Sequence, residues 1–230
     1  MSGFRRRMMM AANSKPYDAE IEYLQGNGSA YINTGVKATY NIRYECSFTI
    51  TEVPPTNFPI FGARVGYGDR SSILYYYRYD STYPYFSWRY GAQDVSNYNV
   101  SNIGDYFATS LNAARTMVIN GVAKSCNTST FTSNNPIYIF AMNNNGATSV
   151  SSSTSVLRIK WMKIYDGTTL VRDFIPVKKN SIGYLYDKVS GELFGNSGTG
   201  NFILGPDVNS TTVVSQAKQR EMLNQQFEEL

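Results

Sequence analysis

Histidine is absent from this chain of 230 residues, and cysteine occurs only twice. The lack of histidine excludes Ser-His-Asp and Cys-His nucleophilic sites, general acid–base catalysis by imidazole, and almost all zinc sites. Cys46 and Cys126 allow at most one disulfide. Because both lie in expected strands, two reduced, buried thiols are the favoured interpretation, with a disulfide as the alternative. The sequence therefore predicts neither a metal site nor a cofactor.

Long apolar runs are also lacking. No segment approaches the roughly 18 consecutive apolar residues of a transmembrane helix, so no membrane insertion is expected. The apolar patch at residues 8–12 is shorter than the core of an export signal, which predicts a protein made and kept in a cytoplasm. The net charge of +4 forms no basic stripe with interleaved aromatics, so no nucleic-acid partner is expected.

Paired carboxylates, which a glycoside hydrolase would place about 5 to 9 Å apart across a groove, are not evident. Asp18, Glu20 and Glu22 share one face of an expected strand, but the sequence shows no second acidic cluster that could face them across a groove. This favours a strand face exposed to solvent. A calcium-binding D-x-D-x-D-G loop is missing as well. Three isolated acids are expected to make hydrogen bonds in turns: Asp69, Asp80 and Asp105. We therefore expect no enzyme.

Tyrosine, serine, threonine and asparagine are abundant instead, and 42% of the residues are hydrophobic. This composition is typical of a β-protein with a sizeable core. The clearest strand lies within residues 40–53, where five apolar residues alternate with polar ones: Ile42, Tyr44, Cys46, Phe48 and Ile50. Similar runs predict about a dozen strands in one domain, residues 18–207.

The stretch 157–206 predicts a chain of short antiparallel strands. Leu157, Ile159 and Trp161 alternate with basic residues, and the phase is lost at residues 162–163, which indicates a bulge or burial on both sides. Asp166-Gly167 predicts a hairpin turn. Pro176 has no N–H to donate, so it is expected to end the returning strand or confine it to an edge.

Two segments carry a family resemblance. The order KIYDG, LVRDFIPV, GYLYDKVSGELF and NSGTGNFILGP resembles the C-terminal half of concanavalin A-like (LamG-type) jelly-roll domains of gut Bacteroidales and their phages. IEYLQGNGSAYINTGV, residues 21–36, is similar to the opening of the same family. The middle of the chain matches no motif. The resemblance implies an all-β fold, a concanavalin A-like jelly-roll sandwich of two antiparallel sheets, but it specifies no function, because this fold hosts many.

A tyrosine-rich hairpin at residues 71–90 is the candidate ligand site. Sugars stack their C–H faces on aromatic rings, and neighbouring polar groups bind their hydroxyls. The hypothetical glycan-binding residues are Tyr75, Tyr77, Tyr79, Tyr83, Tyr85, Trp88 and Arg89. Since alternation sends every second residue inward, half of them should be core, and a core or protein interface is the alternative for the whole set.

The first 17 residues form an expected arm that combines charge with soft apolar side chains. Its hypothetical anchor residues are Phe4, Arg5, Arg6, Arg7, Met8, Met9 and Met10. Such an arm suits docking onto a capsid protein or another virion protein, and a disordered tail is the alternative.

Residues 208–230 contain good helix formers and no glycine or proline, which predicts a C-terminal helix. Its narrow apolar stripe is Val213, Ala217, Leu223, Phe227 and Leu230. Such a helix is marginal alone, so packing on the sandwich or on a partner chain is expected. If the partner chain is a second copy of the protein, the helix forms a homo-oligomer, and a trimer is preferred over a dimer by analogy with fibres.

The family resemblance implies a function for the whole chain. A jelly roll of this type with a short basic arm resembles proteins encoded by Bacteroidales phages, including crAss-like ones. The implied protein is a non-enzymatic virion component, assembled in the host cytoplasm: a capsid-attached head fibre or decoration protein whose sandwich binds surface or mucus glycans. The alternatives are a carbohydrate-binding module, a tail-fibre adhesin or, least favoured, a glycoside hydrolase.

Overall fold

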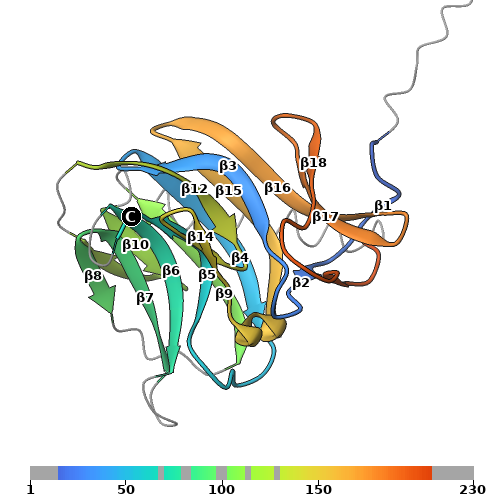
Figure 1. The fold of residues 1–230 in the computed structure, drawn as a ribbon, viewed down its shortest axis with the longest axis horizontal. Helices are drawn as coiled ribbons and strands as arrows, with labels where there is room; N and C mark the ends of the chain where they lie inside the picture. The colour runs from blue at the N-terminus through green and yellow to red at the C-terminus, as the bar shows by residue number, and fades with distance from the viewer. Residues whose placement is uncertain are drawn as a thin grey trace, which may run out of the picture.

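The computed structural model describes residues 15–66, 70–78, 84–96, 103–111, 115–126 and 130–208. These residues form two β-sheets packed face to face, so the predicted all-β sandwich is confirmed (Figure 1). Within these ranges the helical content is one short 3-10 helix, η1 (Ser152–Val156). The anchor residues of the arm and the stripe of the expected C-terminal helix lie outside the described residues.

The first sheet has the hydrogen-bonded order β11-β10-β9-β4-β15-β16-β17-β18, and three short strands pair alongside it. The strands of this order are β4 (Ile42–Ile50), β9 (Gly104–Leu111), β10 (Thr116–Ile119), β11 (Val122–Ser125), β15 (Leu157–Asp166), β16 (Thr169–Lys179), β17 (Ile182–Asp187) and β18 (Glu192–Phe194). The short strands are β1 (Ala19–Glu20), β2 (Leu24–Gln25) and β19 (Ile203–Leu204).

The second sheet has the order β14-β13-β5-β6-β7-β8, and β12 pairs with both β5 and β3. Its strands are β3 (Ile32–Thr39), β5 (Phe58–Arg64), β6 (Ser71–Arg78), β7 (Pro84–Gly91), β8 (Gln93–Ser96), β12 (Thr132–Ile139), β13 (Met142–Asn144) and β14 (Ala147–Ser149). β13 runs parallel to β5, so the prediction of purely antiparallel sheets is wrong at this pair. The chain turns at Phe140, whose φ is +67°, and β12 and β13 then meet β5 in opposite directions.

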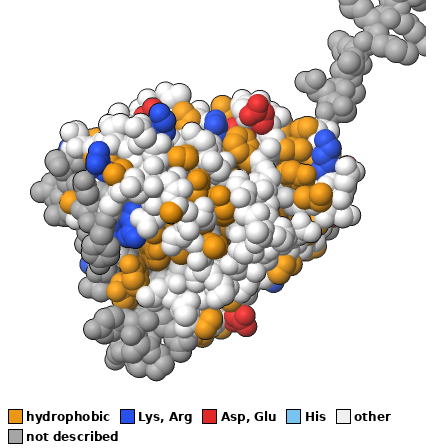
Figure 2. Space-filling model, in the orientation of Figure 1, with side chains coloured by type: hydrophobic (Ala, Val, Ile, Leu, Met, Phe, Trp, Pro, Cys, Tyr) orange, Lys and Arg blue, Asp and Glu red, His pale blue; other side chains and the backbone are white. Residues whose placement is uncertain are grey.

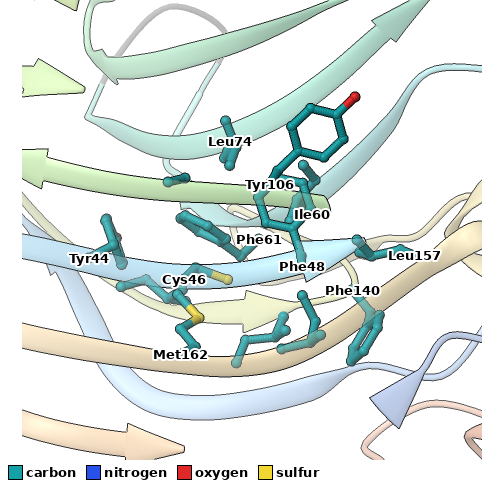
Figure 3. Packing of buried hydrophobic residues seen from close by; sticks show 14 of the residues in the cluster. Tyr44, Cys46, Phe48, Ile60, Phe61, Leu74, Tyr106, Phe140, Leu157 and Met162 are labelled. Carbon is teal, nitrogen blue, oxygen red and sulfur yellow. The ribbon is translucent and has the colours of Figure 1, made fainter. Parts of the chain in front are cut away.

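The core lies between the two sheets, and β4 supplies its centre. The five alternating residues predicted to face inward are all buried: Ile42, Tyr44, Cys46, Phe48 and Ile50. The ring of Tyr44 lies 4.8 Å from that of Phe61 and 5.5 Å from that of Trp88, both on the opposite sheet. Aromatic side chains from the two sheets thus interlock across the sandwich (Figure 3).

Cys46 and Cys126 are both buried and unbonded, as favoured from the sequence. Burial raises the pKa of the Cys46 thiol far above its usual range. Figure 3 shows Cys46 among apolar side chains, with Met162 beside it. Cys46 therefore acts as a small apolar core residue.

The phase change in β15 occurs at Lys160, two residues earlier than expected. The register against β4 shifts between Ile159 and Trp161, and Met162 and Ile164 then point into the core. The bulge converts an inward alternation at odd positions into one at even positions.

Pro176 does not end its strand, and that prediction is wrong. It lies inside β16, where it is paired in register with Leu185 of β17. Its carbonyl accepts a hydrogen bond from the backbone N–H of Ile21, so its nitrogen points to the same side. On that side the pairing of β16 with β15 ends at Phe174, and its pairing with β1 begins at Val177. A donor is not required at this junction.

The two segments that carry the family resemblance lie side by side. Ile21 forms a β-bridge with Asp207, and the backbone N–H of Ser197 donates to the carbonyl of Tyr31. At Gly198 an added Cβ would lie 2.2 Å from the carbonyl oxygen of Ser29, so only glycine fits. The expected single strand at residues 18–24 is accordingly split into β1 and β2, because its two halves pair with different neighbours.

Candidate functional site

The outward face of the β6–β7 hairpin carries the candidate site. Strand register pairs Ile73 with Arg89, Tyr75 with Ser87, and Tyr77 with Tyr85. Side chains of directly paired residues share one face of a sheet. These six residues therefore form one outward row, while the alternate residues of both strands face the core.

Three tyrosines form a continuous aromatic surface on this face. The rings of Tyr75 and Tyr77 lie 5.3 Å apart, and those of Tyr77 and Tyr85 lie 5.2 Å apart with only 11° between their planes. All three are half-buried. In Figure 2 hydrophobic side chains lie beside a Lys or Arg side chain over β6 and β7.

A pocket of about 280 Å³ opens on this face. Buried Ile73 and Ser87 belong to its wall, which also includes half-buried rings and two guanidinium groups. The lining residues are Asn57, Arg64, Ile73, Tyr75, Tyr77, Ser87 and Arg89. A few convergent polar groups around aromatic and apolar walls are typical of small-ligand sites.

Arg64 is held in place from the neighbouring strands. Its Nε donates a 2.8 Å hydrogen bond to Oδ1 of Asn144 on β13. Its backbone carbonyl accepts from Nδ2 of Asn135 at 2.7 Å and from the backbone N–H of Asn145 at 2.8 Å. The parallel pairing of β13 with β5 thus fixes the start of the arginine side chain and orients its guanidinium plane.

The positive charges of Arg64 and Arg89 affect the pKa of Tyr75. Burial raises the pKa of Tyr75, while the positive charges of Arg64 and Arg89 and a hydrogen bond with Ser149 oppose the rise. Arg64 and Arg89 both line the pocket together with Tyr75. The pocket therefore combines two positive charges, aromatic faces and neutral hydrogen-bonding groups.

Gly62 allows β5 to approach β6 closely beside the pocket. It is paired in register with Ile73, and an added Cβ would lie 2.6 Å from the Cα of Ile73 and from the carbonyl oxygen of Ser72. A side chain at this position would therefore separate the two strands that carry Arg64 and Tyr75.

The structure divides the residues predicted for glycan binding. Tyr75, Tyr77 and Arg89 line the pocket, and Tyr85 stacks beside it. Trp88 is 1% exposed and packs against Tyr44 and Phe61, so its assignment to the ligand surface is corrected: it faces the core, opposite to Arg89. The remaining two predicted residues, Tyr79 and Tyr83, lie outside the described residues.

The prediction from the sequence did not include four residues that also line the pocket: Asn57, Arg64, Ile73 and Ser87. Asn57 and Arg64 come from β5 and the segment before it, and Ser87 separates Tyr85 from Arg89 on β7. The alternation of Tyr85, Ser87 and Arg89 would have placed Ser87 on the outer face. Nothing local to Asn57 or Arg64 indicates the hairpin that they meet.

The acidic residues considered for catalysis or calcium binding are placed apart from this pocket. Glu20 pairs with Lys15 at 2.7 Å, and Oδ2 of Asp18 accepts from the backbone N–H of Asn180. Asp105 lies within β9 and not in a turn; it accepts from the Thr49 hydroxyl and pairs with Lys160 at 2.9 Å. The other two acids, Asp69 and Asp80, lie outside the described residues.

Among the described residues, no group of three or more His, Cys, Asp or Glu side chains gathers in a metal-binding arrangement. Nor does that part of the chain contain a helix long and apolar enough to cross a membrane.

The chain matches no protein-family model, and no curated protein matches it either.

Proposed function

We propose that the protein is a non-enzymatic glycan-binding component of a phage virion, built on a concanavalin A-like jelly roll. The observation that carries the binding function is the pocket of about 280 Å³ between Arg64, Tyr75, Tyr77 and Arg89. Aromatic rings offer flat surfaces for the C–H faces of a sugar, and Ser87, Asn57 and the guanidinium groups offer hydrogen bonds to its hydroxyls.

The virion assignment rests on the resemblance of residues 21–36 and 157–206 to jelly-roll domains of Bacteroidales phages. In a head fibre or decoration protein, the arm would bind a capsid protein and the sandwich would project outward with its pocket accessible. Genes for capsid, portal or tail proteins beside the coding gene would support this assignment, and a metabolic operon would contradict it.

Glycan binding is tested with a glycan array probed by the full chain and by Tyr77→Ala. The ring of Tyr77 lies between those of Tyr75 and Tyr85 and contacts both, so its loss should interrupt the aromatic surface and abolish the array signal. A matched control is Tyr184→Ala, a half-buried tyrosine on β17 of the other sheet, which should bind as the wild type does. An array without signal, or equal binding by folded Tyr77→Ala, contradicts the proposal.

Self-association belongs to the same proposal. A fibre or decoration protein is expected to be a homo-oligomer, with three copies preferred over two, and the stripe from Val213 to Leu230 is its proposed contact. Sedimentation at high protein concentration should show a species about three times the chain mass of 25.8 kDa. A single species of 25.8 kDa contradicts the oligomer but leaves glycan binding in place.

A further inference from the structure

Two arginines from different strands line the pocket on either side of Tyr75. Arg64 ends β5 and Arg89 lies within β7, with β6 and Tyr75 between them. Both arginines line the pocket, and both positive charges act on the Tyr75 hydroxyl. A ligand that enters beside Tyr75 therefore meets two guanidinium groups.

Guanidinium groups bind acidic groups more strongly than neutral ones. The planar fork of arginine donates two parallel hydrogen bonds to an acidic group such as a carboxylate, and such charge-assisted bonds are roughly twice as strong as bonds between neutral groups. A hydroxyl of a neutral sugar accepts hydrogen bonds but supplies no negative charge. A carboxylate would thus gain most from a wall that carries two arginines.

The orientation of Arg64 is already set by the protein. Its Nε is bonded to Asn144, and its carbonyl is bonded to Asn135 and Asn145. A preoriented guanidinium loses less side-chain freedom on binding than a flexible one.

The volume and the aromatic rings limit the rest of the ligand. About 280 Å³ lies just below the lower bound of roughly 300 Å³ for pockets that hold drug-sized ligands. A single sugar unit fits this size, with its ring against Tyr75 and Tyr77. The neighbouring ring of Tyr85, which stacks on Tyr77, extends the same surface toward a second unit outside the pocket.

We propose that the pocket recognises an acidic sugar, and that Arg64 and Arg89 bind the carboxylate of a uronic or sialic acid while Tyr75 and Tyr77 contact the ring. This inference rests on the proposed glycan-binding function. It specifies the substrate class of that site and assigns a role to Arg64 that the sequence did not indicate.

The test uses matched pairs of glycans whose carboxylate is either free or esterified. Calorimetry of the full chain compares oligogalacturonate with its methyl ester, and sialyllactose with its sialic acid methyl ester. The acidic member of at least one pair should bind at least about tenfold more tightly, and this advantage should shrink as salt is added. The two pairs distinguish a uronic from a sialic acid as the source of the carboxylate.

Arginine variants then locate the charge recognition. Arg64→Gln and Arg89→Gln should each remove most of the advantage of the acidic member while leaving the weak binding of its neutral partner. Arg64→Lys keeps the charge without the planar fork and should retain part of the advantage; it also serves where Arg64→Gln fails to fold. Lys37→Gln is the matched control, since it removes one exposed positive charge from β3 of the same sheet.

Each outcome separates the inference from the proposed function. Equal affinity for acidic and neutral members, with binding still lost in Tyr77→Ala, overturns the acidic-sugar inference and supports glycan binding. Binding of sulfated sugars alone also overturns the inference, because the recognised group would not be a carboxylate. Failure to bind any glycan overturns both.

Discussion

The side-chain amide of Asn27 donates a 3.1 Å hydrogen bond to the backbone carbonyl of Thr199, 172 residues further along the chain. Oδ1 of the same side chain accepts from the backbone N–H groups of Ser29 and Ala30, at 2.8 and 2.6 Å. One asparagine thus closes the turn after β2 and attaches it to the loop before β19. This contact ties the two ends of the domain together.

Replacing Asn27 by alanine should lower the free energy of unfolding by about 1–3 kcal/mol, because the turn N–H groups lose their acceptor and the Thr199 carbonyl keeps only the Ser29 hydroxyl as a donor. Urea denaturation measures the change. The exposed Asn201→Ala in the neighbouring loop is the control and should stay within about 0.5 kcal/mol of the wild type. Equal midpoints for both variants would show that the contact does not stabilise the domain.

The two tryptophans should respond differently to truncation. Trp88 is 1% exposed between the sheets, so Trp88→Ala should cost about 3–5 kcal/mol. Trp161 is half-buried on the outer side of β15, where its ring lies 5.6 Å from that of Phe107, and its truncation should cost less. Thermal unfolding followed by circular dichroism provides the comparison. A larger loss at Trp161 would contradict the assignment of Trp88 to the core.

Asp187 organises the turn between β17 and β18. Its fully buried carboxylate accepts from the backbone N–H groups of Asp173, Val189 and Ser190, and Arg172 lies 3.6 Å away.

Replacing Asp187 by alanine should destabilise the domain by about 3–5 kcal/mol, because the partly buried charge of Arg172 and three backbone donors lose their acceptor. Asp187→Asn keeps one side-chain oxygen and should lose less. The exposed pair of Asp207 with Lys178 is the control, where Asp207→Ala should cost less than about 1 kcal/mol. Denaturant midpoints measured side by side decide whether the two aspartates differ.

Glu20 makes the start of the domain sensitive to acid. Burial disfavours its charged form, but hydrogen bonds from Lys15 and Tyr17 outweigh burial, so the pKa of Glu20 lies below its usual value. A carboxyl whose pKa is lower in the folded state stabilises that state above the unfolded pKa of about 4.3, and this contribution is lost as pH falls through the folded pKa.

The stability difference between wild type and Glu20→Gln should therefore be constant above about pH 5 and should vanish in more acidic solution. Its size should stay below about 1 kcal/mol, since Lys15 is mostly exposed. Melting temperatures across this pH range provide the measurement. A difference that grows on acidification has the opposite sign and would exclude the assigned role of Glu20.

Removal of the arm should separate attachment from folding. Tyr17 is buried against Tyr186, with ring centroids 5.0 Å apart, so contacts with the sandwich begin inside the expected arm. Deletion of residues 2–14 should leave the melting temperature unchanged and abolish incorporation into particles. Deletion of residues 2–20 should also lower the melting temperature, because β1 is lost. Normal incorporation of the shorter deletion would assign anchoring to the C-terminal segment.

Local alternation predicted much of the sandwich. In β4 every second residue is large and apolar while its neighbours are polar, so one face is specified without knowledge of partners. The hairpin β6–β7 was likewise predictable, but both of its faces carry aromatic residues. Tyr75 and Tyr76 are the same residue type on opposite faces, and only the buried environment of Tyr76 distinguishes them. Trp88 and Arg89 are adjacent in β7 and therefore point to opposite faces, so they cannot both belong to the outward surface.

The rest of the site depends on contacts between distant segments. Arg64 is oriented by Asn144, which lies 80 residues later in the chain. The two residues meet because β13 pairs in parallel with β5, and no local sequence pattern predicts this pairing. Pro176 similarly violates a rule that holds for a continuous ladder, because the strand beside it changes at that position. Both cases are decided by neighbouring strands, which a single sequence does not identify.

The pairing of the two domain ends determines how the fold bears load. The N–H of Val208 donates to the carbonyl of Glu20, and the N–H of Glu22 donates to that of Pro206, in an antiparallel arrangement. Both free ends therefore leave from the same end of this short ladder. Tension applied between them opens its hydrogen bonds one after another, which needs far less force than shearing them together. If a particle binds the protein at one end of the chain only, drag from flowing solvent places no tension between the two ends, and the hydrogen bonds of this ladder stay closed.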